Sequence, residues 1–373
     1  MDATLDLIPD SLRTPLAFVV VLGVLIFIHE LGHYLAARWR GVHVERFSVG
    51  FGRAITAWTD KRGTEWRIGW LPLGGYVKLH GQEQPADATE EERAAWKPGR
   101  TVHDKPVGDR AIVVAAGPLA NCLLAAVLFA GLFMVQGRPT NPGAAMVGLV
   151  SEGSAAAAAG LRPGDRIVAL DDVTITRFEQ IQRHVQPRAG QPVQLRYERE
   201  GQPNSVAVTP TPRASDGLGI LGISGGATVF ERLDPASALL AGVVYTGDIS
   251  AQTLAGLWQM ISGTRGTEEL GGPLRIAQLS GQVAEMGLVP LISFIAILSV
   301  NLALINLFPI PVLDGGHLMF YAAEAIRGRP VPPRAQEVGF RAGFALLVAL
   351  FVFSTWNDLT QLGLFRWVAG LVG

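Results

Sequence analysis

The stretch LAFVVVLGVLIFIHELGHYLAA, from Leu16 to Ala37, decides the architecture of this 373-residue chain. As a helix it would rise about 33 Å, enough to cross the ~30 Å hydrocarbon layer of a bilayer. A cleaved signal peptide is the alternative, but the preceding MDATLDLIPD is acidic and the apolar run is too long. We therefore predict a tail at residues 1–15 and a transmembrane helix at 16–37.

Three further apolar runs are long enough to span a membrane, at residues 111–136, 288–313 and 338–357. They account for a composition with only 17% charged residues, against ~25% in a typical soluble domain, and a mean hydropathy of +0.30. One cysteine excludes a disulfide framework, and the net charge of −1 gives no reason to expect nucleic acid as a partner. The predicted fold class is an α-helical polytopic membrane protein with four transmembrane helices.

Basic residues gather in the connections between the first two spans and between the last two: Arg38, Arg40, Arg46, Lys105, Arg110, Arg327, Arg329, Arg334 and Arg341. By the positive-inside rule, both connections, 38–110 and 314–337, are expected to be cytoplasmic. Both termini, 1–15 and 358–373, and the segment from 137 to 287 then lie outside. In a bacterium this topology corresponds to the inner membrane, with the external parts in the periplasm.

The two long connections each carry a fold signal. Residues 44–58 and 64–79 of the cytoplasmic connection are typical of β-hairpin strands with glycine turns, either lying at the membrane interface or forming a small solvated domain. Outside, residues 137–225 predict a compact α+β domain of short strands and two helices. The following segment, 226–287, is predicted to be helical and amphipathic, either on the membrane surface or packed against the third span.

The first span contains His29-Glu30-Leu31-Gly32-His33, an HExxH motif. Residues i and i+4 share one helix face, so both imidazoles can reach one metal ion. Zinc suits imidazole ligands, and at an open coordination position it lowers the pKa of a bound water towards ~7. Glu30 is offset and placed to take a proton from that water. A structural histidine pair is the alternative, but it leaves a costly intramembrane glutamate unexplained.

Asp314 is the best candidate for the third ligand that a catalytic zinc ion usually needs. It follows the third span at its cytoplasmic end, and His29 also lies in the cytoplasmic half of its span. Pro309 and Pro311 interrupt the helix there, which a membrane tolerates only beside protein or a polar cavity. An aspartate that caps a turn at the membrane boundary is the alternative.

Together these motifs resemble the site-2 protease family of intramembrane zinc metalloproteases, and within it the bacterial regulator-of-sigma-E protease type. The likeness follows the chain in order: HELGH, FSVGFG (47–52), PLGGYVKL (72–79), AAGPLAN (115–121), GGPLRIA (271–277) and NLFPIPVLDGGHL (306–318). It implies Zn²⁺ held by His29, His33 and Asp314, Glu30 as general base, and a membrane-associated β-structure at FSVGFG. It implies substrate binding by Asn301, Asn306, Pro309, Pro311, Gly50 and Gly52.

The external domain resembles a PDZ domain, with GLRPGD (160–165) as the most telling piece. PDZ domains bind extended peptides or C-termini by adding a strand to a sheet edge. One such domain is found, whereas the best-known proteins of this type carry two in tandem, so relatives with a single PDZ domain are the better comparison. A purely structural role for the domain stays open.

The resulting prediction is an enzyme that hydrolyses a peptide bond within or near the transmembrane segment of a single-pass membrane protein. By resemblance, the substrate is an anti-sigma factor-like regulator or a signal-peptide remnant, and the active site faces the cytoplasmic side. A strand near residues 47–55 or 70–79 is expected to hold the unwound substrate. The alternatives are a membrane metal transporter and a catalytically inactive PDZ-bearing scaffold; neither nucleic acid nor a further cofactor is expected.

Overall fold

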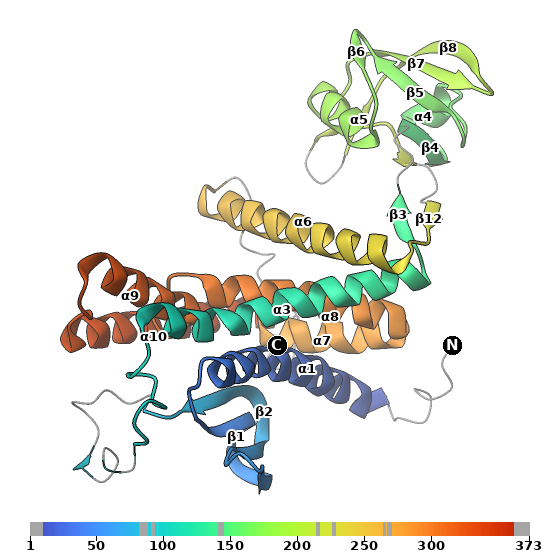
Figure 1. Cartoon of the computed structure of the whole chain (residues 1–373). Coiled ribbons are helices and arrows are strands. Elements are labelled where there is room, and N and C mark those ends of the chain that lie inside the picture. Colours follow the sequence, from blue (N-terminus) through green and yellow to red (C-terminus); the bar gives the residue numbers. More distant parts are fainter. Residues whose placement is uncertain are drawn as a thin grey trace, which may run out of the picture. The chain divides into compact units, whose positions relative to one another are not determined.

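The structure, a computed structural model, describes residues 10–81, 89–90, 94, 96–140, 145–213, 217–225, 229–263, 266 and 271–361. The chain forms two compact units. We call residues 135–233 the sheet unit, and residues 1–134 with 234–373 the helical unit (Figure 1). Of the predicted tails, residues 1–9 and 362–373 lie outside the described residues.

Four helices of the helical unit are long and apolar enough to cross a membrane: α1 (Asp10–Trp39), α3 (Val107–Val135), α8 (Leu288–Leu307) and α10 (Pro333–Gln361). They confirm the predicted polytopic fold class. Helix α8 is shorter than the apolar run at 288–313, because Pro309 and Pro311 cannot donate the backbone hydrogen bonds that would continue the helix. The predicted connection at 314–337 is mostly helical, since α9 (Asp314–Arg327) begins directly at the aspartate.

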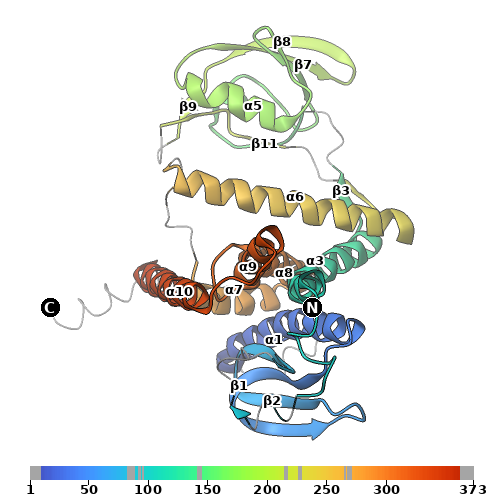
Figure 2. The ribbon, with the colours of Figure 1, turned by 60° about the vertical axis from the view of Figure 1, so that its left-hand side comes forward.

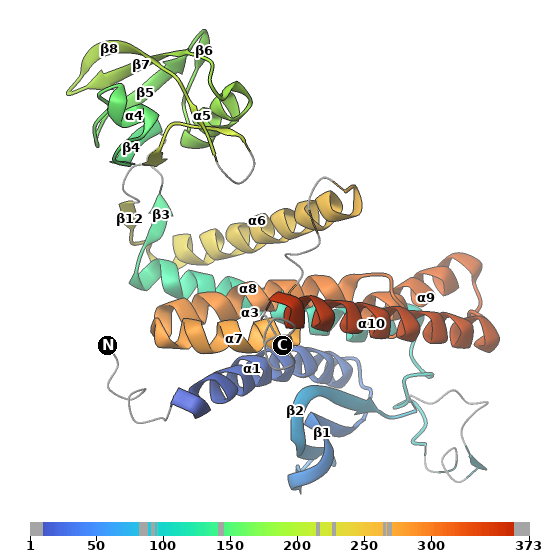
Figure 3. The ribbon, with the colours of Figure 1, turned by 180° about the vertical axis from the view of Figure 1, so that it is seen from behind.

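Two further helices, α6 (Pro235–Ile261) and α7 (Pro273–Glu285), fill most of the predicted 226–287 segment. Helix α6 packs against membrane-spanning neighbours: a Cβ on Gly242 would lie 2.3 Å from the Ala126 carbonyl oxygen of α3. Helix α7 lies along α1, and Figures 2 and 3 show α7 and α10 from two further sides.

Asp358, a carboxylate in the apolar helix α10, is only 1% exposed. It accepts hydrogen bonds from the backbone N–H groups of Gly272 (2.8 Å), Leu274 and Arg275 (3.1 Å each) at the start of α7. The free N–H groups of a helix N-terminus and its positive dipole favour such a carboxylate. An acid that is costly in a membrane helix is therefore used to hold α7 against α10.

The connection between α1 and α3 forms two long strands, β1 (Val44–Thr59) and β2 (Glu65–Leu79), beside α1 in all three views (Figures 1, 2 and 3). Both strands bend, β1 at Gly50 and Gly52, which have φ of +85° and +82°. The bends bring residues 44–49 between 65–68 on one side and 75–79 on the other, while 54–59 pairs with 65–69. Within the described residues, the edges of this sheet are therefore 54–59 and 75–77.

The sheet unit contains a six-stranded sheet in the order β11-β4-β5-β7-β8, with β6 paired to β5. Its strands are β4 (Ala145–Val150), β5 (Arg166–Leu170), β6 (Val173–Thr174), β7 (Val193–Arg199), β8 (Gln202–Val208) and β11 (Ile223–Gly225). Helices α4 (Ala155–Ala158) and α5 (Phe178–Val185) contribute to its core. The unit exceeds the predicted 137–225, because β3 (Arg138–Thr140) pairs with β12 (Val229–Glu231).

One buried ion pair anchors the GLRPGD turn of the sheet unit. Asp165 is 1% exposed, and its two carboxylate oxygens accept from Nε (2.7 Å) and Nη2 (2.8 Å) of Arg199. The backbone N–H of Arg162 donates to the same carboxylate at 2.7 Å. This network joins the turn before β5 to the end of β7.

Candidate metal centre

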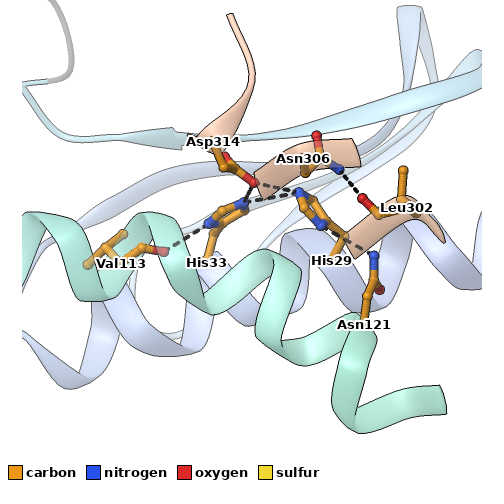
Figure 4. A network of polar contacts seen from close by, with 7 residues as sticks. All are labelled: His29, His33, Val113, Asn121, Leu302, Asn306 and Asp314. Atoms are coloured by element: carbon orange, nitrogen blue, oxygen red, sulfur yellow. Dashed lines mark hydrogen bonds and ion pairs between the residues drawn. The ribbon is translucent and has the colours of Figure 1, made fainter. Parts of the chain in front are cut away.

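Three side chains that the sequence places far apart meet at one point of the helical unit (Figure 4). His29 and His33 come from successive turns of α1, and Asp314 is the first residue of α9. The Oδ2 atom of Asp314 lies 3.2 Å from His29 Nε2 and 3.5 Å from His33 Nε2, and the two Nε2 atoms are 3.2 Å apart. Among the described residues, this is the single group of three or more that could hold a metal ion.

The donor atoms fit a cation. Asp314 Oδ2 is buried and, among the described residues, accepts no hydrogen bond, although two imidazole nitrogens face it. Two nitrogen lone pairs and a carboxylate oxygen directed at one point repel one another unless positive charge lies between them. Two imidazoles and one carboxylate are also a ligand set that zinc uses in catalytic sites.

Helix α3 determines which nitrogen of His33 is free. His33 Nδ1 donates to the carbonyl oxygen of Val113 at 2.9 Å, which leaves the Nε2 lone pair for a metal ion. The ring lies directly against Gly117, where an added Cβ would be 2.3 Å from His33 Nε2. A residue without a side chain is therefore required at position 117.

Asn121 lies beside the other histidine. Its Nδ2 atom is 3.4 Å from His29 Nδ1, and its Oδ1 atom is buried without a hydrogen-bond partner among the described residues. Turning the amide by 180° places Oδ1 against the Nδ1–H group, so that the amide accepts and His29 Nε2 is free. The backbone carbonyl of Asn121 also accepts from Ser299 Oγ of α8 at 2.8 Å.

Glu30 lies beside this centre rather than within the ligand group. Its side chain runs along the β1–β2 sheet, because a Cβ on Gly75 would lie 3.1 Å from Glu30 Cγ and 2.8 Å from the Ser48 carbonyl oxygen. The Glu30 side chain therefore lies against Gly75 of β2, and its role in proton transfer stays a prediction.

The turn between α8 and α9 holds Asp314 in place. Gly315 and Gly316 pack directly onto carbonyl oxygens of this turn. A Cβ added at Gly315 would lie 2.2 Å from the Phe308 oxygen, and one added at Gly316 would lie 2.4 Å from the Ile310 oxygen. Val312 adopts a φ of +97°, which is strained for a β-branched residue and persists only where the surroundings enforce it. Helix α10 supplies part of that enforcement, because a Cβ on Gly343 would lie 2.0 Å from the Pro311 carbonyl oxygen.

The predicted substrate-binding residues occupy several places. Asn301 accepts a hydrogen bond from Thr253 Oγ1 of α6 at 3.2 Å, and Asn306 donates to the Leu302 carbonyl at 3.1 Å beside the metal centre (Figure 4). Pro309 and Pro311 lie in the turn before Asp314. Gly50 and Gly52 form the bend of β1. Their contact with a substrate stays a prediction.

Sequence reasoning did not assign Val113, Gly117, Asn121 or Ser299. The signal for Asn121 is present, since an amide in an apolar span needs a partner. Gly117 and the Val113 carbonyl have no such signal, because their importance depends on a helix that is distant in sequence. His317 packs its ring against Phe340 with 5.3 Å between centroids.

Comparisons with known proteins agree on one family. The family model of Peptidase family M50 matches residues 17–350 of this chain. A "Putative zinc metalloprotease" of Agrobacterium fabrum is 42% identical over 366 residues, which cover 92% of this chain and 95% of that protein. Metalloprotease MmpA of Caulobacter vibrioides is 36% identical over 393 residues, covering 95% and 97%.

Among solved structures, the PDZ domain of an SdrC-like protein from Listeria monocytogenes aligns with 24% of this chain and 92% of its own length. The sequence identity is 20% and the TM-score is 0.21.

Proposed function

Because this chain belongs to peptidase family M50, we propose that it is an intramembrane zinc endopeptidase of the site-2 type. The observation that carries the proposal is the convergence of His29, His33 and Asp314 within an assembly of apolar helices, with Glu30 beside them. A transport path would need several metal sites across the membrane. A single such group among the described residues favours one reaction centre.

The chemistry divides between the ion and the chain. Zn²⁺ held by His29, His33 and Asp314 would supply, when bound, Lewis-acid polarisation of the scissile carbonyl and of the attacking water. The Glu30 carboxylate accepts a proton from that water and then gives it to the leaving nitrogen. The Val113 carbonyl keeps His33 in the tautomer that leaves its Nε2 atom free, and Asn121 with its amide turned by 180° would do the same for His29.

A transmembrane substrate must unwind before its peptide bonds can react, because a helix keeps its carbonyl groups in internal hydrogen bonds. The sheet edge at residues 75–77 begins against Glu30 and supports capture of the unwound segment by strand addition. Residues 46–49 are paired on both sides, so 70–79 is the better of the two predicted strands.

Proline substitutions test this capture, because proline removes a backbone donor from a strand edge. Proline introduced at successive positions from 75 to 77 should lower the cleavage rate and leave the zinc content unchanged. Matched substitutions at 54–58, on the opposite edge, should affect cleavage less. Unchanged cleavage for every variant in 75–77 would exclude strand addition at this edge.

Exposed apolar side chains support a membrane-associated β1–β2 sheet. The bent part of the sheet exposes Phe51, Ile55, Trp58, Ile68 and Trp70. Aromatic and aliphatic groups of this kind, beside Arg53 and Arg67, suit the boundary between headgroups and hydrocarbon. The sheet would then meet a substrate at the cytoplasmic face of the membrane.

Topology and substrate are the finer parts of the proposal. The distribution of basic residues supports a cytoplasmic β1–β2 sheet, with the sheet unit and both termini in the periplasm of a bacterial cell. The substrate would be an anti-sigma factor-like single-pass protein or a signal-peptide remnant. The sheet unit, interpreted as a PDZ domain, would exclude bulky ectodomains or bind newly formed C-termini.

Reconstitution with a labelled membrane-spanning substrate tests the proposed activity. Wild type should cleave, Glu30→Gln should abolish cleavage while retaining zinc, and Asp314→Asn should lose both. Glu337→Gln, at an exposed position of α10, is the matched control and should cleave normally. Cleavage that survives Glu30→Gln would refute the mechanism. Metal uptake into sealed vesicles without cleavage would identify a transporter, and neither activity would favour a scaffold.

A further inference from the structure

Helix α3 provides no metal ligand, yet one of its faces contacts the segments that carry all three. We call Arg110, Val113, Gly117 and Asn121 the α3 contact face; helical periodicity places them on one side. Val113 and Gly117 orient and accommodate His33, and Asn121 contacts His29. The fourth member, Arg110, lies one turn before Val113 and contacts neither histidine in the described structure.

Arg110 instead reaches α9, the helix that begins with Asp314. Its guanidinium group forms an ion pair with Glu324 and lies over the Tyr321 ring, 4.9 Å from the centroid. Its Nε atom donates to the Lys105 carbonyl oxygen at 3.2 Å. The ion pair is sheltered, since the side chains of Arg110 and Glu324 are 16% and 17% exposed.

The spacing along the two helices matches. Gly117 lies seven residues after Arg110, and Tyr321 lies seven residues after Asp314, which corresponds to about 10 Å along each helix. His33, held against Gly117, contacts Asp314 at one end of this interval. At the other end Arg110 contacts Tyr321 and Glu324. Helix α9 is thus attached to α3 at two points that fix its position along the α3 axis.

We propose that Arg110 and Glu324 are positioning residues for the metal centre: their ion pair holds α9 so that Asp314 meets the two histidines oriented by α3. The inference rests on the proposed metalloprotease function. It assigns a role to a sheltered ion pair that neither proton transfer nor metal ligation uses.

A second ion pair of the same chemistry provides the control. Arg341 and Glu337 pair within one helix, four residues apart, with side chains 79% and 60% exposed. Such a pair contributes little to structure. Comparing Glu324→Gln with Glu337→Gln therefore separates loss of the interhelix contact from loss of one negative charge.

The experiment uses the full chain in lipid nanodiscs, loaded with Co²⁺ or Zn²⁺. Metal affinity is measured by competition with a chelator, ligand geometry by the visible absorption of bound Co²⁺, and stability by thermal unfolding of the metal-free protein. The variants are Glu324→Gln, Arg110→Lys, the exchanged pair Arg110→Glu with Glu324→Arg, and Glu337→Gln. Asp314→Asn gives the reference for a lost ligand.

Glu324→Gln should weaken metal binding about tenfold, at the lower end of the effect of groups that orient metal ligands. The Co²⁺ spectrum should change, while metal-free unfolding should resemble that of Glu337→Gln. Arg110→Lys should bind metal more tightly than Glu324→Gln, and the exchanged pair should recover part of the affinity.

Three results would overturn the inference. Glu324→Gln with wild-type affinity and spectrum would remove the positioning role while leaving the proposed function intact, provided that wild type binds metal and cleaves. A Glu324→Gln spectrum identical to wild type, with a lowered unfolding temperature, would indicate a merely structural ion pair. Wild type that binds no metal would refute the proposed function together with the inference.

Discussion

Replacing Gly117 by alanine adds one methyl group to the α3 face against which His33 lies. The added Cβ would be 2.3 Å from His33 Nε2, and ordinary van der Waals contact begins at 3.4 Å, so the ring must move by about 1.1 Å. A displacement of this size at a reacting group can lower a rate by ~100-fold. The substitution also removes a glycine from a helix, which alone would stabilise the protein by about 1 kcal/mol.

The substitution should therefore lower the cleavage rate without lowering the stability of the fold, which distinguishes it from a variant that is inactive because it unfolds. Gly117→Ala should lose cleavage by ~100-fold and bind zinc more weakly, yet the metal-free protein should unfold no earlier than wild type. Gly131→Ala in the same helix is the control, because a Cβ there meets nothing within 4 Å. It should keep full activity. Cleavage, chelator competition and thermal unfolding provide the three measurements, and a Gly117→Ala variant with wild-type zinc affinity would refute the reasoning.

Three other changes test separate contacts. Asn121→Ala removes the partner of His29 Nδ1 and should weaken zinc binding 10- to 100-fold in chelator competition; unchanged affinity would contradict this role. Asp358→Asn should destabilise the start of α7 by about 1 kcal/mol, seen as faster hydrogen exchange at residues 272–276, and unaltered exchange would speak against the cap. Arg199→Met should destabilise the sheet unit, because it leaves the buried Asp165 carboxylate without its charged partner. Burial raises the pKa of Asp165, but the hydrogen bonds and charge of Arg199 outweigh it and keep that pKa below its usual value. This contribution is therefore complete above the unfolded pKa of ~3.9 and is lost as pH falls through the lower folded pKa. Hydrogen exchange in β5 and β7 should accelerate in that acid range, and less so in Arg199→Met.

The sequence was sufficient for features that depend on local pattern. Apolar runs predicted four membrane helices, and the spacing of His29 and His33 placed two imidazoles on one face. Asp314 could be selected because the predicted topology places it at a depth in the membrane similar to that of the two histidines. The structure brings these three residues together, and their role as zinc ligands stays a prediction.

Other features depend on partners that local sequence does not reveal. The apolar run continues to residue 313, but Pro309 and Pro311 follow the end of α8 at Leu307, and α9 begins at Asp314. The central position of residues 44–49 in the sheet follows from bends and long-range pairing. The function of Asp358 requires knowing that the start of α7 lies against α10. Each case needs a through-space contact before the residue can be interpreted.

The α3 contact face changes how loss of activity should be recognised among related chains. A relative could keep HExxH and the later aspartate while carrying a larger residue where Gly117 stands, or an apolar one in place of Asn121. Every ligand would then be present, and a search based on the motif would classify that chain as an enzyme. Its imidazoles would nevertheless be displaced or fixed in the wrong tautomer. Inactive members of this family should therefore be sought by the helix that orients the ligands as well as by the ligands themselves.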